Sequence, residues 1–89
     1  MPSLEATLNE TIRLLLTRTG KRHADVADAV GITRGSMTLR LQGKSRWRLD
    51  DLPAAADAFG LTVCELISGY RAIPEDRLPP PAGGGQTRI

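Results

Sequence analysis

The chain has 89 residues, of which 12 are Lys or Arg and 10 are Asp or Glu, and it contains one Trp, one Tyr, one Phe and one Cys. This length allows one small domain and excludes a TIM barrel or a two-halved dinucleotide-binding fold, which need far more chain. The hydrophobic fraction of 40% consists mostly of Ala, Leu, Val and Ile, which suit a small helical core.

The cysteine content and the N-terminal sequence favour a protein of a reducing cytoplasm. Cys64 has no second cysteine with which to form a disulfide, and no Cys and His pairs have the spacing of a zinc site. No segment approaches the roughly 18 apolar residues of a membrane span, and the first ten residues do not resemble a secretion signal. We therefore expect a cytoplasmic protein without a membrane partner.

Charge is unevenly distributed along the chain. Residues 13–48 carry nine cations and two anions, whereas residues 1–12 carry two acids and residues 49–89 carry six acids and three Arg. A basic middle between acidic flanks favours a polyanionic partner.

Two helices are predicted in the first third of the chain. Apolar residues recur at helical spacing over about 4–18, with Ser3 in place to cap the N-terminus and Gly20 just after the C-terminus. Residues 23–30 place apolar side chains on one stripe and end at Gly31, which can adopt a left-handed backbone conformation. The second helix is therefore short, about two turns.

Three further helices are predicted after the glycine turn. Thr33 is in place to cap a third helix that ends shortly after Leu41. After a basic loop, residues 49–60 have apolar residues at helical intervals, and Pro53 either lies in the first turn of this fourth helix or removes one backbone hydrogen bond from it. A capping box formed by Thr62 and the glutamate three residues later predicts a fifth helix over about residues 63 to 68.

The composition changes at residue 71. Pro fills positions 79–81 and Gly fills positions 83–85, and few apolar residues remain. We therefore expect a domain over residues 1–70 and a flexible tail over 71–89 that has little to pack against. The alternatives for this tail are a partner arm and a dimer contact.

The segment 23–42 has a strict order of small, glycine and apolar residues. Ala27 is small enough for two helices to cross closely, Gly31 permits the turn between them, and Met37 can fill the space that they enclose. This segment resembles the helix-turn-helix of the Cro and lambda-repressor (XRE) family of bacterial and phage regulators, and the likeness extends over roughly residues 4–69.

The resemblance implies an all-α, compact five-helix lambda-repressor-like DNA-binding domain, with its helix-turn-helix at about residues 23–42. In this family the second helix lies over the phosphates of double-stranded DNA and the third enters the major groove.

The outer side of the third helix holds the predicted base readers. A rotation of about 100° per residue places Leu39 opposite the buried Met37 and Leu41. Arg34 can donate two hydrogen bonds to guanine, with a phosphate contact as the alternative, and Leu39 can contact a thymine methyl group, with partial burial as the alternative. At the second position of this helix, where the family usually has a polar side chain, this chain has Gly35. The predicted base-reading residues are Arg34, Gly35, Ser36, Leu39 and Gln42.

Cations and hydroxyl groups around this surface are predicted phosphate contacts, with a merely solvated side chain as the alternative. His23 opens the motif, where the resemblance implies a phosphate contact. Trp47 is expected to anchor the basic loop by packing against the third and fourth helices, with stacking on DNA as the alternative. The predicted phosphate-contacting residues are Lys21, Arg22, His23, Thr33, Thr38, Arg40, Lys44 and Arg46.

No catalytic, metal or cofactor site is predicted. Residues 43–45 read Gly-Lys-Ser as in a phosphate-binding P-loop, but Thr38 stands where that motif needs glycine. The adjacent acids at 50–51 are explained by solvation and by the dipole of a helix start. Cys64 has no neighbouring base in the sequence and is expected to be buried. We expect neither an enzyme nor a small-molecule ligand.

The end of the predicted domain offers two interpretations. Leu66, Ile67, Tyr70 and Ile73 either form a homodimer contact, as a pseudo-palindromic DNA site would require, or close the core of a monomer.

The sequence therefore predicts a sequence-specific, double-stranded DNA-binding transcriptional regulator that acts by operator occupancy. The resemblance favours a Cro-like protein or short repressor of phage, prophage or bacterial origin. The alternatives are an antitoxin, a recombination-directionality protein, and a protein-interaction module that kept the fold without DNA binding.

Overall fold

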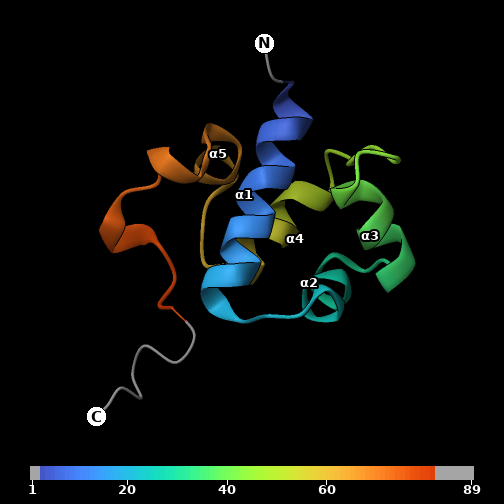
Figure 1. Cartoon of the computed structure of the whole chain (residues 1–89), viewed down its shortest axis with the longest axis horizontal. Helices are drawn as coiled ribbons and strands as arrows, with labels where there is room; N and C mark the ends of the chain where they lie inside the picture. Colours follow the sequence, from blue (N-terminus) through green and yellow to red (C-terminus); the bar gives the residue numbers. More distant parts are fainter. Residues whose placement is uncertain (1–2, 82–89) are drawn as a thin grey trace.

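The computed structural model describes residues 3–81, in which helices form around α1 and no strand is present (Figure 1). The elements are α1 (Leu4–Thr19), α2 (His23–Val30), α3 (Arg34–Leu41), α4 (Asp51–Ala58), α5 (Val63–Ser68) and two 3-10 turns, η1 (Tyr70–Ala72) and η2 (Glu75–Arg77). The predicted all-α fold with five helices is confirmed.

Side-chain caps explain where α1 and α5 begin. The Ser3 hydroxyl oxygen accepts a backbone N–H of the first turn of α1 at 3.0 Å. Thr62 and Glu65 form the predicted capping box: the Thr62 hydroxyl oxygen accepts the Glu65 N–H at 3.1 Å, and the Glu65 carboxylate accepts the Thr62 N–H at 2.9 Å. Helix α1 ends before Gly20, whose φ of 73° lies in the left-handed region.

The fourth helix begins later than the apolar pattern of its sequence. Because α4 starts at Asp51, Pro53 lies in the first turn, where its missing N–H removes no helical hydrogen bond. Leu49, the first apolar residue of the pattern, precedes the helix and is 84% exposed.

The core lies on both sides of α1. Figure 1 shows α1 crossing the centre of the molecule, with α2 and α3 on one side and α5 with the C-terminal segment on the other. The side chains of Ile12, Leu15, Val26, Met37 and Leu66 are fully buried. Together with Ala55 and Ala56 of α4, apolar side chains from all five helices exclude water from a single core.

The segment after α5 packs against the domain, contrary to the expectation from its composition. Ile73 is 5% exposed, Leu78 is half-buried, and Arg18 of α1 donates a hydrogen bond from Nε to the carbonyl oxygen of Pro79. The expectation that this part of the tail has little to pack against is wrong, because Ile73 and Leu78 pack against the core and Arg18 holds the Pro79 carbonyl. Residues 82–89 of the predicted tail lie outside the described residues.

The same packing corrects the predicted self-association face. Leu66 is 0% exposed and Ile73 is 5% exposed, so a second copy cannot reach either side chain. Ile67 and Tyr70 are half-buried. For Leu66 and Ile73 the dimer interpretation is wrong, and the alternative, that they close the core of one chain, is right.

Cys64 is exposed rather than buried. It lies on the outer side of the short helix α5, whereas Leu66 occupies the inner side. Among residues 3–81, no three His, Cys, Asp or Glu side chains gather as metal ligands would. No helix of this part of the chain is long and apolar enough to cross a membrane.

Candidate nucleic-acid interface

Helices α2 and α3 are joined by a turn of defined geometry. Gly31 has a φ of 85°, which strains any residue with a side chain, although no atom lies within 4 Å of where its Cβ would stand. The Gly31 N–H donates to the Ala27 carbonyl oxygen at 2.8 Å. Two residues later the Thr33 hydroxyl oxygen accepts the Ser36 N–H at 3.1 Å and caps α3. The turn therefore sets the direction in which α3 leaves α2.

The side of α3 that holds the predicted base readers faces solvent. Leu39 is 44% exposed, whereas Met37 and Leu41 are 0% and 4% exposed and belong to the core. Of the predicted base readers, Arg34, Gly35, Leu39 and Gln42 are exposed and Ser36 is half-buried. A Cβ at Gly35 would meet only the Thr33 hydroxyl oxygen, at 3.9 Å, so nothing within the chain requires a glycine there.

Exposed basic side chains lie at both ends of the motif, around the start of α2 and after the end of α3. Lys21, Arg22 and His23 are exposed around the start of α2, and Lys44 and Arg46 are exposed in the loop after α3. The two ion pairs found within residues 3–81 involve other side chains, so no carboxylate of this part neutralises these groups. Thr33 is exposed but uses its hydroxyl in the cap, and Thr38 is half-buried.

Arg40 is not available to contact phosphate. The residue is 8% exposed, its Nη1 lies 2.9 Å from Asp51 Oδ2, and its guanidinium lies 5.5 Å from the centre of the Trp47 ring. Asp51 is also 8% exposed and accepts the Arg48 N–H at 3.0 Å. The predictions of a phosphate contact for Arg40 and of a solvated carboxylate for Asp51 are both wrong, because the two charges are buried against each other.

Trp47 attaches the basic loop to α1. Its Nε1 donates to Asn9 Oδ1 at 2.6 Å, and its backbone N–H donates to Glu5 Oε2 at 2.8 Å. Asn9 and Glu5 were not among the predicted site residues, because their partner Trp47 lies 38 and 42 residues away in the sequence. The available signal was a polar residue, Asn9, beside Leu8 and Ile12 on the buried side of α1.

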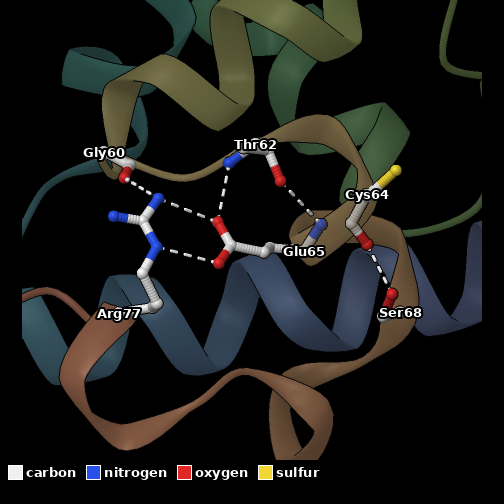
Figure 2. Close-up of polar contacts among 6 residues, drawn as sticks. All are labelled: Gly60, Thr62, Cys64, Glu65, Ser68 and Arg77. Carbon is white, nitrogen blue, oxygen red and sulfur yellow. Dashed lines mark hydrogen bonds and ion pairs between the residues drawn. The ribbon is translucent and has the colours of Figure 1, made fainter.

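A second polar cluster lies at α5, which Figure 1 shows on the other side of α1 from α3, and Figure 2 shows its contacts. Arg77 holds the Glu65 carboxylate with two contacts, Nε to Oε2 at 2.9 Å and Nη2 to Oε1 at 3.0 Å, and Nη2 also donates to the Gly60 carbonyl oxygen at 3.2 Å. The hydrogen bonds from Arg77, followed by the one from the Thr62 backbone, lower the pKa of Glu65 from 4.5 to about 2. Because its cation is paired, this cluster adds little to the basic surface around α3.

Known proteins share this fold at low sequence identity. No protein-family model and no curated protein sequence matches the chain. A crystal structure of the clp gene regulator ClgR from Corynebacterium glutamicum is similar with a TM-score of 0.70 and 18% identity, over 79% of this chain and 74% of that one. The solution structure of the SOS-response transcriptional repressor LexA from Eubacterium rectale is similar with a TM-score of 0.67 and 19% identity, over 97% of this chain and 88% of that one. The chain therefore has the same fold as these two proteins.

Proposed function

We propose that this chain is a sequence-specific, double-stranded DNA-binding transcriptional regulator. The observation that carries the proposal is the solvent-facing side of α3 with exposed Lys and Arg side chains at both ends of the motif, four of which (Lys21, Arg22, Lys44 and Arg46) no carboxylate of the described part neutralises. The major groove of B-DNA admits one α-helix, and phosphates line both of its edges. A helix that is flanked in this way matches the groove in both shape and charge.

The proposed contacts follow from the position of each side chain. Arg34, at the N-terminal end of α3, reads guanine, and Leu39 contacts a thymine methyl group. Ser36 and Gln42 contact further base edges, and Gly35 lets the backbone approach the groove. The proposed phosphate contacts are Lys21, Arg22, His23, Thr33, Thr38, Lys44 and Arg46.

We further propose that the protein acts by occupancy, as a Cro-like protein or short repressor of phage, prophage or bacterial origin. Binding to an operator that overlaps a promoter would exclude polymerase without any chemical step. The similar fold of a clp gene regulator and of an SOS-response repressor supports this role. A homodimer would match two half-sites about 10 base pairs apart, and Ile67 and Tyr70 are the residues of the predicted contact that stay partly accessible.

Selection from a pool of random duplexes tests the proposal. The wild type should enrich one sequence, and Arg34→Ala should lose that enrichment. Lys44→Ala should weaken binding to all duplexes alike and lower the slope of log affinity against log salt concentration by about one. Arg71→Ala removes an exposed cation from η1, which follows α5, and is the matched control, which should change neither quantity. No enriched duplex for the wild type at low salt would overturn the proposal.

A further inference from the structure

The C-terminal end of α3 is held by two side chains of α1. Asn9 Nδ2 donates to the Arg40 carbonyl oxygen at 2.9 Å, and the Arg13 guanidinium donates to the Leu41 carbonyl oxygen. The last carbonyls of a helix have no partner within the helix, and cations are favourable at that end. Asn9 and Arg13 are one turn apart and so reach α3 from the same side of α1.

Asn9 joins α3 to the basic loop as well. While its Nδ2 donates to Arg40, its Oδ1 accepts the Trp47 Nε1 proton at 2.6 Å. The Trp47 ring in turn lies 5.5 Å from the Arg40 guanidinium, which pairs with Asp51 at the start of α4. We call these five residues, Asn9, Arg13, Arg40, Trp47 and Asp51, the α3 clamp.

The chemistry of the clamp is more suited to fixing geometry than to adding stability. Asn9 is 8% exposed, and the buried Nε and Nη1 of Arg40 make no hydrogen bond, although Nη1 contacts Asp51 as an ion pair. A buried ion pair with unsatisfied donors gains little net free energy over apolar packing. A buried amide with one acceptor and one donor partner, however, tolerates only one orientation of the groups around it.

The loop that this clamp holds carries two of the proposed phosphate contacts. Its backbone folds back onto α3, since the Lys44 N–H donates to the Leu39 carbonyl oxygen at 2.9 Å and the Ser45 N–H donates to the same oxygen at 3.3 Å. The side chain of Leu39 belongs to the proposed base-reading side. The distance between base readers and loop cations is therefore set by the end of α3 and by Trp47.

We infer that Asn9 and Trp47 are positioning residues for DNA recognition, which act without touching DNA. They fix the loop cations relative to the base readers of α3, so that phosphate and base contacts form in one register. This inference rests on the proposed function. It adds that the preference for one DNA sequence depends on contacts among α1, α3 and the basic loop that do not themselves touch DNA.

Two conservative substitutions test the inference. Asn9→Asp keeps an oxygen for the Trp47 Nε1 proton but places a second oxygen against the Arg40 carbonyl. Trp47→Phe keeps an aromatic ring over Arg40 but removes the donor to Asn9. Ala72→Asp adds the same negative charge as Asn9→Asp at an exposed position beyond α5 and is the matched control.

The readout is the dissociation constant for a shuffled duplex divided by the dissociation constant for the duplex that the wild type selects. It is measured at a temperature at which circular dichroism shows each variant fully folded. Both clamp variants should lower this ratio by about tenfold, with less than about a twofold change in binding to the shuffled duplex. A residue that serves only stability would lower the unfolding temperature and leave the ratio unchanged.

The outcomes separate the inference from the proposed function. If the wild type selects a duplex and the folded clamp variants keep its ratio, the inference is overturned and the proposed function stands. An equal fall of this ratio in Ala72→Asp would also overturn the inference, since the added charge would then explain the effect. If the wild type selects no duplex, the proposed function falls and the inference falls with it. Should Asn9→Asp fail to fold, Trp47→Phe decides.

Discussion

Within the described residues, the two sides of α1 each hold one ion pair, and the pairs differ in their access to water. The side chains of Arg40 and Asp51, next to α3, are each 10% exposed, whereas those of Arg77 and Glu65, next to α5, are 45% and 19% exposed. An exposed pair is screened by water and salt, so it adds little stability and its removal is tolerated. A buried pair is costly to break, because the remaining charge has no water to solvate it.

The largest expected effect comes from breaking the buried pair. Asp51→Ala leaves the Arg40 guanidinium buried without a counter-charge and removes the acceptor of the Arg48 N–H. We expect the free energy of unfolding to fall by about 3 kcal/mol, measured by urea denaturation. The double variant Arg40→Met with Asp51→Ala should recover most of this loss, because no charge remains buried. A single variant as stable as the wild type would show that water reaches Arg40.

The next effect tests whether the segment after α5 is part of the domain. Ile73→Ala removes apolar atoms from a side chain that is 5% exposed. The free energy of unfolding should fall by about 2 kcal/mol, by the same measurement, because a cavity replaces the buried side chain. Pro74→Ala, at an exposed neighbour, is the control and should change little. If Ile73 instead served a dimer, the loss would depend on protein concentration.

A smaller effect separates stability from DNA recognition on α3. Gly35→Ala should raise the free energy of unfolding by about 0.5 kcal/mol, because alanine favours the helix and the added Cβ has room. The same variant should bind the selected duplex more weakly, since the methyl group would stand between the backbone and the groove. Thermal unfolding and a mobility shift measure the two effects. Tighter DNA binding by Gly35→Ala would remove the proposed role of this glycine.

The smallest effect concerns the exposed pair and its dependence on pH. The pKa of Glu65 is lowered from 4.5 to about 2, so the ion pair contributes stability above pH 4.5 and loses it as the pH falls toward 2. The difference in unfolding temperature between the wild type and Arg77→Met should therefore be largest near neutral pH and shrink between these two values. Arg71→Met, which removes an exposed arginine outside the pair, should show no such trend. A difference that is constant with pH would mean that Arg77 acts through packing alone.

Local patterns in the sequence predicted much of the fold and the outer side of α3. Caps such as Ser3 and Thr62, the glycine at 31 and the spacing of apolar residues act within a few positions of one another. They therefore mark where each helix begins and ends within a short stretch of sequence, while packing in the core stabilises the helices.

Contacts between distant segments could not be predicted in the same way. Arginine is a residue type that usually lies at the surface. The burial of Arg40 depends on Asp51 and Trp47, which lie outside α3. Asn9 and Ile73 likewise acquire their roles from partners outside their own segment. A single sequence carries no local signal of which polar residues will meet in the core.

The separation between the α3 clamp and the outer side of α3 bears on how this protein could be redesigned. Leu39 has an apolar side chain, and within residues 3–81 the Gln42 side chain makes no hydrogen bond to Asn9, Trp47 or Asp51. Their chemistry could therefore be exchanged without disturbing the junction that supports them. A library randomised on the outer side of α3, with the clamp kept intact, should yield folded variants with new target sequences.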